Sequence, residues 1–485
     1  MPGRHPASAE HPERYVAWGE SAEADELRRV GAVTRALLSD RSWVSRRVET
    51  VRYLTASTIE RNVSFDLDTL RLARLAHQAG HPVDAPLLLP LVKLRKNLLL
   101  DLDLHYGDGT PAQVARSDQD SVAAQGVVLD ALVRDGVPSA SVSRAVAETI
   151  LSAARGMPSQ EDVETLVLNE PNEVELWRLQ QNLAPEDGGT RPWDELIGAG
   201  GEFTEWLTAF TLDFMLMTEV SLKSAPWMLK FRYVETQEPA NMLLRERLNL
   251  VSYGTLLAAP GVGAASREHL RVEGPAGMLI EDVDLFDMRD DPDVRQAPVA
   301  AQGKRTFERR VSLDRAVIYT SKPPRGSYYA AVSMRVNPAG FIRRSQYLIF
   351  LTAIVLVAGG LAEERWRTLS ASSNATEPTV ALLLVIPTLL LAYISREGDH
   401  QILGDLLRVP RLVVAFTGVV SLAAAAGFVF GLKCTPLAWL WIVAGVWSCV
   451  VFVWLRWVTY RGHAVVHSVT QRHDKTYTID ILEFS

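Results

Sequence analysis

The stretch LLLDLDLHYGDGT, residues 98–110, holds the side chains whose types and spacing come closest to a chemical site. Asp101, Asp103 and His105 stand at alternate positions, and carboxylates and imidazoles are common ligands of metal ions. The residues between them are leucines. Strict alternation of this kind is typical of a strand with one face on a core and one face in water.

The residues after this stretch favour a solvated hairpin over a metal site. Gly107-Asp108-Gly109 tolerates the positive φ of a tight turn, and residues 111–114 can return as the partner strand. Alternate side chains on one strand are about 7 Å apart, whereas metal ligands converge to within about 2–2.6 Å of an ion. A metal site remains the alternative, and it would require ligands from other segments.

Motifs of enzyme active sites are not found in the sequence. There is no Gly-x-Ser-x-Gly elbow, Walker loop or His-Glu-x-x-His motif, and neither of the two cysteines has the context of a nucleophile. Gly261 and Gly263 lack the third glycine and the helix of a nucleotide-binding loop. The sequence therefore predicts no catalytic, cofactor-binding or metal-binding residues, and an enzyme is the least favoured class.

Four apolar segments in the C-terminal part predict transmembrane helices. A hydrocarbon core of about 30 Å requires roughly 20 helical residues. The last two segments meet this length, and the first two do so with their flanking residues. No Asp, Glu, Lys or His lies in the middle of any of them, so nothing indicates an ion or proton pathway. The segments are Tyr347–Ala362, Thr379–Ile394, Leu412–Leu432 and Leu437–Val458.

The basic residues near the ends of these segments predict the orientation. Ten lie on the side of the N-terminal region and three on the other side. Because basic residues accumulate in cytoplasmic loops, both termini and the N-terminal region are expected in the cytosol of a cell (inner or plasma) membrane. The N-terminus lacks the apolar core of a signal peptide. The ten residues are Arg335, Arg343, Arg344, Arg396, Arg408, Arg411, Arg456, Arg461, Arg472 and Lys475.

Two features of the membrane part concern packing. Ile402, Leu403, Leu406 and Leu407 share one helical face, which predicts a short helix on the membrane surface. Gly427 and Gly431 are four residues apart and predict a close helix contact, either within the chain or between chains.

The N-terminal region has alternating helical and β-rich patterns, and we expect an α+β fold. Residues 1–20 are a disordered lead, 21–116 a mixed part with a helix over 23–38 and strands around 46–67, and 117–226 a helical part. The apolar run Phe203–Leu222 contains three acidic residues, so a buried soluble helix is favoured over a fifth span.

The remaining soluble segments are expected to be β-structure. Five alternating runs within 227–340 have the spacing of a small antiparallel β-sandwich next to the membrane. Residues 341–460 form the four transmembrane helices, and 461–485 are expected to form a cytosolic β-hairpin. The fold class is thus two β-rich parts around a helical part, followed by an all-α membrane region.

Three stretches carry a resemblance to known sequences. They are PLVKLRKNLLLDLDLHYGDGTP, EHLRVEGPAGM and SREGDHQILGDLLRVPRL. Together they resemble a group of uncharacterised actinobacterial multi-pass membrane proteins with a large cytosolic N-terminal region. The resemblance runs from about Ser42 to Gly431. It implies an architecture, but no activity and no functional residue.

Two functions follow as hypotheses. In the first, a multi-pass membrane protein binds a protein or small-molecule partner through its cytosolic domains, with the helices as anchor. In the alternative, a sensor–effector, the helices of several copies form a pore under control of those domains. The lipid bilayer is the expected partner, with a cytosolic protein or a second copy possible. The net charge of −7 gives no indication of nucleic acid.

Overall fold

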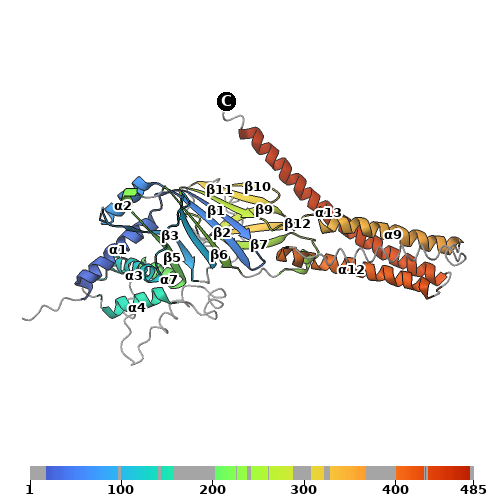
Figure 1. Ribbon diagram of the computed structural model, residues 1–485, viewed down its shortest axis with the longest axis horizontal. Coiled ribbons are helices and arrows are strands. Elements are labelled where there is room, and N and C mark those ends of the chain that lie inside the picture. Colours follow the sequence, from blue (N-terminus) through green and yellow to red (C-terminus); the bar gives the residue numbers. More distant parts are fainter. Residues whose placement is uncertain are drawn as a thin grey trace, which may run out of the picture.

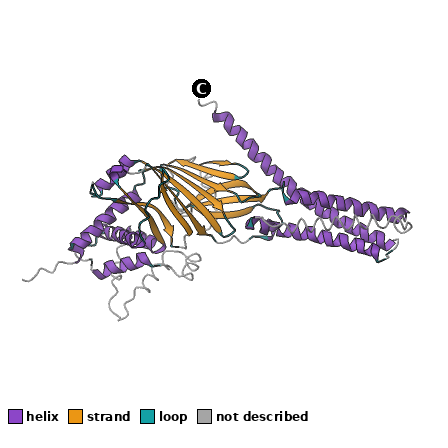
Figure 2. Cartoon of the chain, viewed as in Figure 1, coloured by secondary structure: helices purple, strands orange, loops and turns teal. Residues whose placement is uncertain are grey.

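The architecture has three parts along its long axis in a computed structural model (Figure 1). Helices gather at one end, β-sheets occupy the middle, and three long apolar helices extend from the other end (Figure 2). The structure describes residues 18–82, 84–96, 100–139, 142, 144–156, 202–224, 227–237, 242–259, 261–287, 307–321, 328–366, 400–430, 432 and 435–480.

The helices of the N-terminal region confirm three of the expected segments. Ser21 accepts a hydrogen bond from the Ala24 N–H and caps the first helix. That helix crosses α3 so closely that a Cβ on Gly31 would lie 1.9 Å from the carbonyl oxygen of Gly126. The helices are α1 (Ala22–Ser39), α2 (Thr69–Gln78), α3 (Ser117–Arg134), α4 (Arg144–Arg155), α7 (Glu202–Leu212) and α8 (Leu244–Arg247), with 3₁₀ turns at Trp18–Glu20 and Leu222–Ser224.

The strands lie in a seven-stranded sheet, a three-stranded sheet and a two-stranded sheet. The seven-stranded sheet has the order β10-β11-β8-β1-β2-β6-β4, and β1 runs parallel to β8. The other two are β7-β12-β9 and β3-β5. The strands are β1 (Val44–Tyr53), β2 (Thr58–Leu67), β3 (Leu87–Arg95), β4 (Leu100–Tyr106), β5 (Asp213–Val220), β6 (Met228–Thr236), β7 (Tyr253–Ala258), β8 (Arg267–Glu273), β9 (Met278–Asp287), β10 (Phe307–Val311), β11 (Arg315–Ser321) and β12 (Tyr328–Val336).

The expected β-sandwich over 227–340 is wrong. Three of the five predicted strands, β6, β8 and β11, instead extend the sheet that β1, β2 and β4 begin, together with β10, and both sheets are open. The exposed edges of β1 and β2 offer unpaired N–H and C=O groups, and added strands satisfy them. Only β7, β12 and β9 remain to pair among themselves.

The expected helix over Phe203–Leu222 is only partly confirmed. Helix α7 ends at Leu212, and β5 begins at Asp213 and pairs with β3. The run FMLM, residues 214–217, is apolar throughout, so periodicity does not separate helix from strand there. The segment forms a strand because it pairs with β3, which lies more than a hundred residues away in the sequence.

Three apolar helices are long enough to cross a bilayer among the described residues. They are α9 (Phe341–Trp366), α12 (Gln401–Val429) and α13 (Thr435–Asp480). The segment Thr379–Ile394, expected as a fourth span, lies outside the described residues. The structure therefore shows an N-terminal α+β region with mixed sheets followed by three long apolar helices.

Glycines bring α9 and α13 together at van der Waals distance. A Cβ on Gly359 would lie 2.4 Å from the Trp441 ring, and one on Gly445 would lie 2.6 Å from Val357. The expected contact at Gly427 is within the chain, because its Cβ would lie 2.6 Å from Leu440 of α13. The sequence interpretation missed the close contacts at Gly359 of α9 and Gly445 of α13.

Two further expectations for the C-terminal part of the chain are wrong. Ile402, Leu403, Leu406 and Leu407 do not lie on a membrane surface, because they belong to α12 itself and are buried in an apolar cluster with the sheets. The tail expected as a β-hairpin continues α13 as helix to Asp480 and projects away from the sheets (Figure 1). A helix satisfies its own backbone hydrogen bonds, whereas an added strand needs a partner.

Candidate functional site

The predicted hairpin stretch lies on the edge strand β4, which pairs with β6. Leu104 is buried, and Leu102 and Tyr106 pack against the same apolar cluster, as the alternation predicts. Asp103 and His105 lie on the opposite face, where His105 Nε2 is 2.7 Å from Asp103 Oδ2. A register shift interrupts the strand between Leu100 and Asp103, and Asp101 in this bulge has a φ of 51°.

The tight turn is confirmed, but the return strand is wrong. Asp108 Oδ1 accepts hydrogen bonds from the Thr110 N–H (2.9 Å) and hydroxyl (2.7 Å), and Gly109 has a φ of 87°. After the turn, Pro111 makes only a single bridge to His105. Proline has no N–H with which to continue a ladder, and the chain leaves for β5, where Val114 bridges Thr218.

Asp103 and His105 line an open depression of about 320 Å³ on the outer face of the seven-stranded sheet. We call it the sheet depression. Every lining residue comes from β1, β2, β4 or β6. They are Val48, Thr50, Asn62, Val63, Ser64, Asp103, His105, Lys230, Phe231 and Arg232.

The charges in the sheet depression are only partly balanced. Arg232 is paired with Glu60 at 2.6 Å. Lys230 is exposed, and no carboxylate among the described residues lies within ion-pairing distance of it. His105 Nδ1 is buried and has no hydrogen-bond partner among the residues that the structure describes. The depression therefore offers one ammonium group that a polar ligand can use.

A network of buried charges lies on the inner face of the same strands. Arg47 and Glu49 of β1 are paired with each other, and Glu49 also binds Arg61 of β2. Arg61 Nε is 2.6 Å from Glu235 of β6, and its Nη2 donates to the carbonyl oxygen of Ala258. Burial by itself would raise the pKa of Glu49, but the two arginines outweigh it and hold that pKa below its usual range.

The loop that contains Gly261 and Gly263 packs against this network. A Cβ on Gly261 would lie 2.1 Å from the Arg47 guanidinium, so the loop closes over that side chain. The N–H groups of Gly263 and Ala265 each donate to Glu268 Oε1 at 2.8 Å. Burial raises the pKa of Glu268, although Arg47 and these N–H groups oppose the shift. The loop thus binds a carboxylate of its own chain.

The buried network separates two apolar clusters along the strands. On β1, Val44 belongs to the cluster with β3 and β5, and Val51 belongs to the cluster with β7, β12 and the long helices. On β2, Arg61 lies between Ile59 and Val63. Ile59 belongs to the cluster with the long helices, and Val63 belongs to the cluster with β3 and β5. Removing one partner of a buried ion pair leaves an uncompensated buried charge, so we assign the network a structural role.

A second buried polar group lies between α3, α4 and β5. Lys96 Nζ donates to the carbonyl oxygens of Ala153 and Ala154 at the end of α4, where a cation also complements the helix dipole. Asp120 accepts the Met215 N–H at 3.0 Å. Burial lowers the pKa of Lys96 to about 8 and raises the pKa of Asp120 to about 6.

Sequence reasoning missed these buried groups because their partners are distant in the chain. One signal was available: Arg47 and Glu49 share strand parity with Val51 and Tyr53, so charged and apolar residues occupy the same face. Lys96 and Asp120 carry no comparable pattern.

Comparison with known proteins gives no match to any family model, curated protein or solved structure. Groups of three or more His, Cys, Asp or Glu placed to hold a metal ion are not found among the described residues.

Proposed function

We propose that the chain is a membrane-anchored binding protein whose sheet depression takes a small anionic molecule. In this proposal four helices span an inner or plasma membrane, namely α9, the segment Thr379–Ile394, α12 and α13. Both termini and the N-terminal region lie in the cytosol. This is the architecture that the resemblance to multi-pass membrane proteins implies.

One observation carries the proposal: the strands of the sheet depression and the long helices share one apolar core. Val51 of β1 and Ile59 of β2 belong to the same buried cluster as Ile342, Leu406 and Leu455 of the three helices. The β1–β2 turn also touches the start of α12, where the Ala56 N–H donates to Gln401 Oε1 at 3.2 Å. The binding face is thus built directly onto the anchor.

The charges support an anion as ligand. Lys230 supplies an uncompensated ammonium group, and Arg232 and His105 line the same depression. A phosphate or carboxylate group accepts hydrogen bonds from cations in the charge-assisted geometry that gives the strongest such bonds. The hydroxyls of Thr50 and Ser64 can complete the coordination.

The test of the anchor uses the native Cys434, which lies in the predicted outer loop. In a Cys449→Ser variant, we expect a membrane-impermeant maleimide to label intact cells, and the chain to remain in membranes washed with alkaline carbonate. An Arg52→Cys variant without the two native cysteines serves as control and should be labelled only after lysis. Loss of the chain in the carbonate wash would refute the anchor.

The test of the ligand uses the purified full chain in mild detergent. Inorganic phosphate, succinate and adenosine monophosphate are the probes, and thermal stability is the readout. A ligand at a hundred times its Kd stabilises a protein by about 2.7 kcal/mol. We expect at least one probe to raise the Tm, and Lys230→Ala but not Arg52→Ala to abolish the shift. A shift that Lys230→Ala leaves unchanged would refute the site.

The contact between the β1–β2 turn and α12 also favours a second candidate, the sensor–effector. In that candidate, ligand binding moves α12 through Tyr53, whose carbonyl lies 3.3 Å from His400 Nε2, and several copies form a pore. Reconstitution in planar bilayers separates the two candidates, because only the sensor–effector predicts a ligand-dependent conductance.

A further inference from the structure

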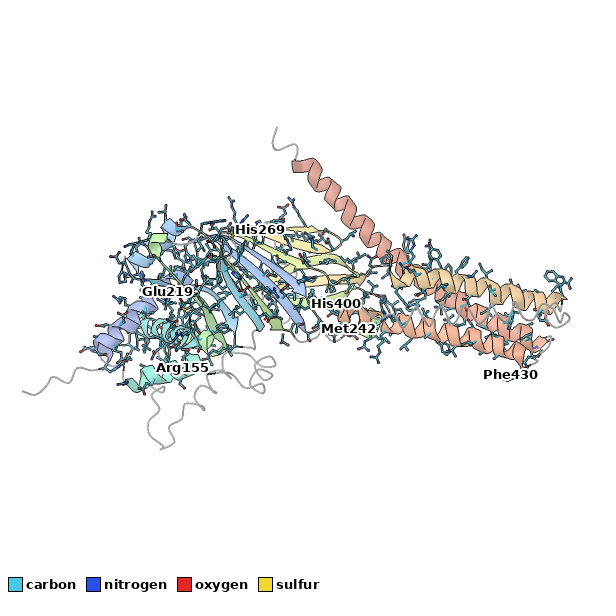
Figure 3. All side chains as sticks on the ribbon, in the orientation of Figure 1. Arg155, Glu219, Met242, His269, His400 and Phe430 are labelled. Atoms are coloured by element: carbon cyan, nitrogen blue, oxygen red, sulfur yellow. The ribbon has the colours of Figure 1, made fainter. Side chains whose placement is uncertain are left out.

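Helix α8 and the turn after it are tied to two of the long helices. The Asn249 side-chain amide donates to the carbonyl oxygen of Leu406 on α12 at 3.3 Å. Arg461 of α13 donates to the carbonyl oxygen of Leu250 at 2.9 Å. Met242, just before α8, and His400, just before α12, both lie where the sheets meet the long helices (Figure 3).

These contacts place α8 at the depth of the lipid headgroups if the helices span a membrane. The exposed apolar surface of α12 begins at Leu412, six residues or about 9 Å beyond Leu406. Arg461 follows the buried Val458 of α13 by three positions. Headgroup layers occupy roughly 5–8 Å on each side of the hydrocarbon core, so an offset of about 9 Å places Leu406 at the outer edge of this layer.

The side chains that α8 presents are unusual for a surface in water. Leu243 is 57% exposed and Leu244 is 68% exposed. Val251, after the turn, is exposed as well. Adjacent exposed leucines at this depth suit insertion among acyl chains near the headgroups, where amphipathic segments bury their apolar residues.

Exposed arginines lie on α8 and on the parts of α9, α12 and α13 that pack against the sheets, and we call them the arginine belt. Two of the belt contact aromatic rings, since the Arg461 guanidinium lies 4.2 Å from the Trp457 ring centre and that of Arg343 lies 5.9 Å from Tyr347. Rings and guanidinium groups together are typical interface anchors. The belt comprises Arg245, Arg247, Arg343, Arg408, Arg456 and Arg461.

The belt carries a net positive charge. Among the described residues of the same segments, two carboxylates are present, Glu246 and Asp405. Glu246 is turned to the backbone, where its Oε2 accepts the Leu243 N–H at 2.7 Å. The charge complementarity therefore favours an anionic lipid surface over a zwitterionic one.

We propose that α8 and the arginine belt bind the phosphate headgroups of anionic phospholipids in the leaflet next to the N-terminal region, with Leu243 and Leu244 inserted among the lipid chains. This inference rests on the proposed membrane anchor, and it is independent of the sheet depression. Anchoring by the long helices holds the belt at the surface, so lipid binding fixes the tilt of the sheets relative to the membrane.

The experiment counts lipids that remain bound to the full chain. Native mass spectrometry in mild detergent is carried out after addition of phosphatidylglycerol or phosphatidylcholine. We expect wild-type protein to retain phosphatidylglycerol in preference to phosphatidylcholine. Arg245→Gln/Arg247→Gln should weaken that binding at least about fivefold, the change expected from one arginine near an anionic surface.

The matched control is Arg52→Gln/Arg267→Gln, which removes two exposed arginines from the outer face of the sheet and should leave lipid binding unchanged. Equal retention of the two lipids, or equal loss in both double variants, would overturn the lipid site. Neither result would contradict the proposed membrane anchor. The anchor is refuted only if the alkaline carbonate wash releases the chain from the membranes.

Discussion

Asn249 donates its side-chain amide to the one carbonyl in α12 that Pro410 leaves without a helical partner. In a helix the carbonyl of Leu406 would accept the N–H of residue 410, and proline has none. The Asn249 side chain reaches this oxygen at 3.3 Å from a buried position with a φ of 54°. The bond thus joins the α+β region to a long apolar helix at the point where proline interrupts that helix's backbone hydrogen bonds.

We expect Asn249→Gly to lower stability because it removes the donor while it tolerates the positive φ. A buried carbonyl left unpaired costs about 1–3 kcal/mol. In a Pro410→Ala background residue 410 regains its N–H, so the same substitution should cost much less. The measurement is a double-mutant cycle on the Tm in detergent. Equal costs in both backgrounds would show that the amide does not serve this carbonyl.

The raised pKa of Asp120 predicts a dependence of stability on pH. The folded state holds this proton up to about pH 6 and the unfolded state only to about pH 4, so stability falls as pH rises between these values and then stays constant. Two pKa units correspond to about 3 kcal/mol. Asp120→Asn retains the acceptor for the Met215 N–H and removes the titration.

The measurement is the unfolding free energy of wild type and Asp120→Asn from pH 4 to pH 7, a range in which Lys96, with a pKa of about 8, stays protonated. We expect the unfolding free energy of Asp120→Asn to rise relative to that of the wild type as the pH increases from about 4 to about 6. If the unfolding free energies of the two proteins change with pH in parallel, Asp120 has the same pKa in the folded and the unfolded state.

Gly445 allows α9 and α13 to pack closely, and a larger residue there should destabilise the helices. A Cβ at Gly445 would lie 2.6 Å from a methyl of Val357. Overpacking of this kind typically costs about 1–3 kcal/mol, so Gly445→Val should lower the Tm. Gly404→Ala is the matched control, because nothing lies within 4 Å of its Cβ, and it should stabilise slightly. A Gly445→Val protein as stable as wild type would contradict the packing.

Glu49 holds the buried network together, and its neutralisation should cost more than that of a surface carboxylate. Glu49→Gln leaves Arg47 and Arg61 undercompensated in a buried site, for which about 3–5 kcal/mol is typical. Asp66→Asn breaks the exposed pair with Arg46 (2.7 Å) and should cost about 1 kcal/mol or less. Denaturant unfolding at neutral pH compares them, and similar losses would contradict the role of Glu49.

The pKa of Glu49 also sets the pH range in which the stabilising contribution of its carboxylate is lost. Because the folded-state pKa is depressed, the stability it provides is complete above the unfolded value of about 4.5 and disappears as pH falls through the lower, folded value. The difference between wild type and Glu49→Gln should therefore shrink in acid and stay constant between pH 6 and pH 8.

The sequence by itself determined the elements whose periodicity is local. It predicted α1, α3 and α4, most of the strands, the turn at Asp108 and the three described apolar helices, because burial of one face or of a whole segment repeats at fixed intervals. It also placed Asp103 and His105 on a wet face of β4. These features depend on residues within one or two turns of each other.

Only the tertiary structure decided which elements meet. The parallel pairing of β1 with β8, the switch from α7 to β5, and the burial of the first turns of α12 depend on partners more than a hundred residues away. Arg61 with Glu235, and Asn249 with Leu406, satisfy polar groups that no local pattern relates. A buried polar group must find a partner wherever the fold brings one, and that choice belongs to the packing of the whole chain.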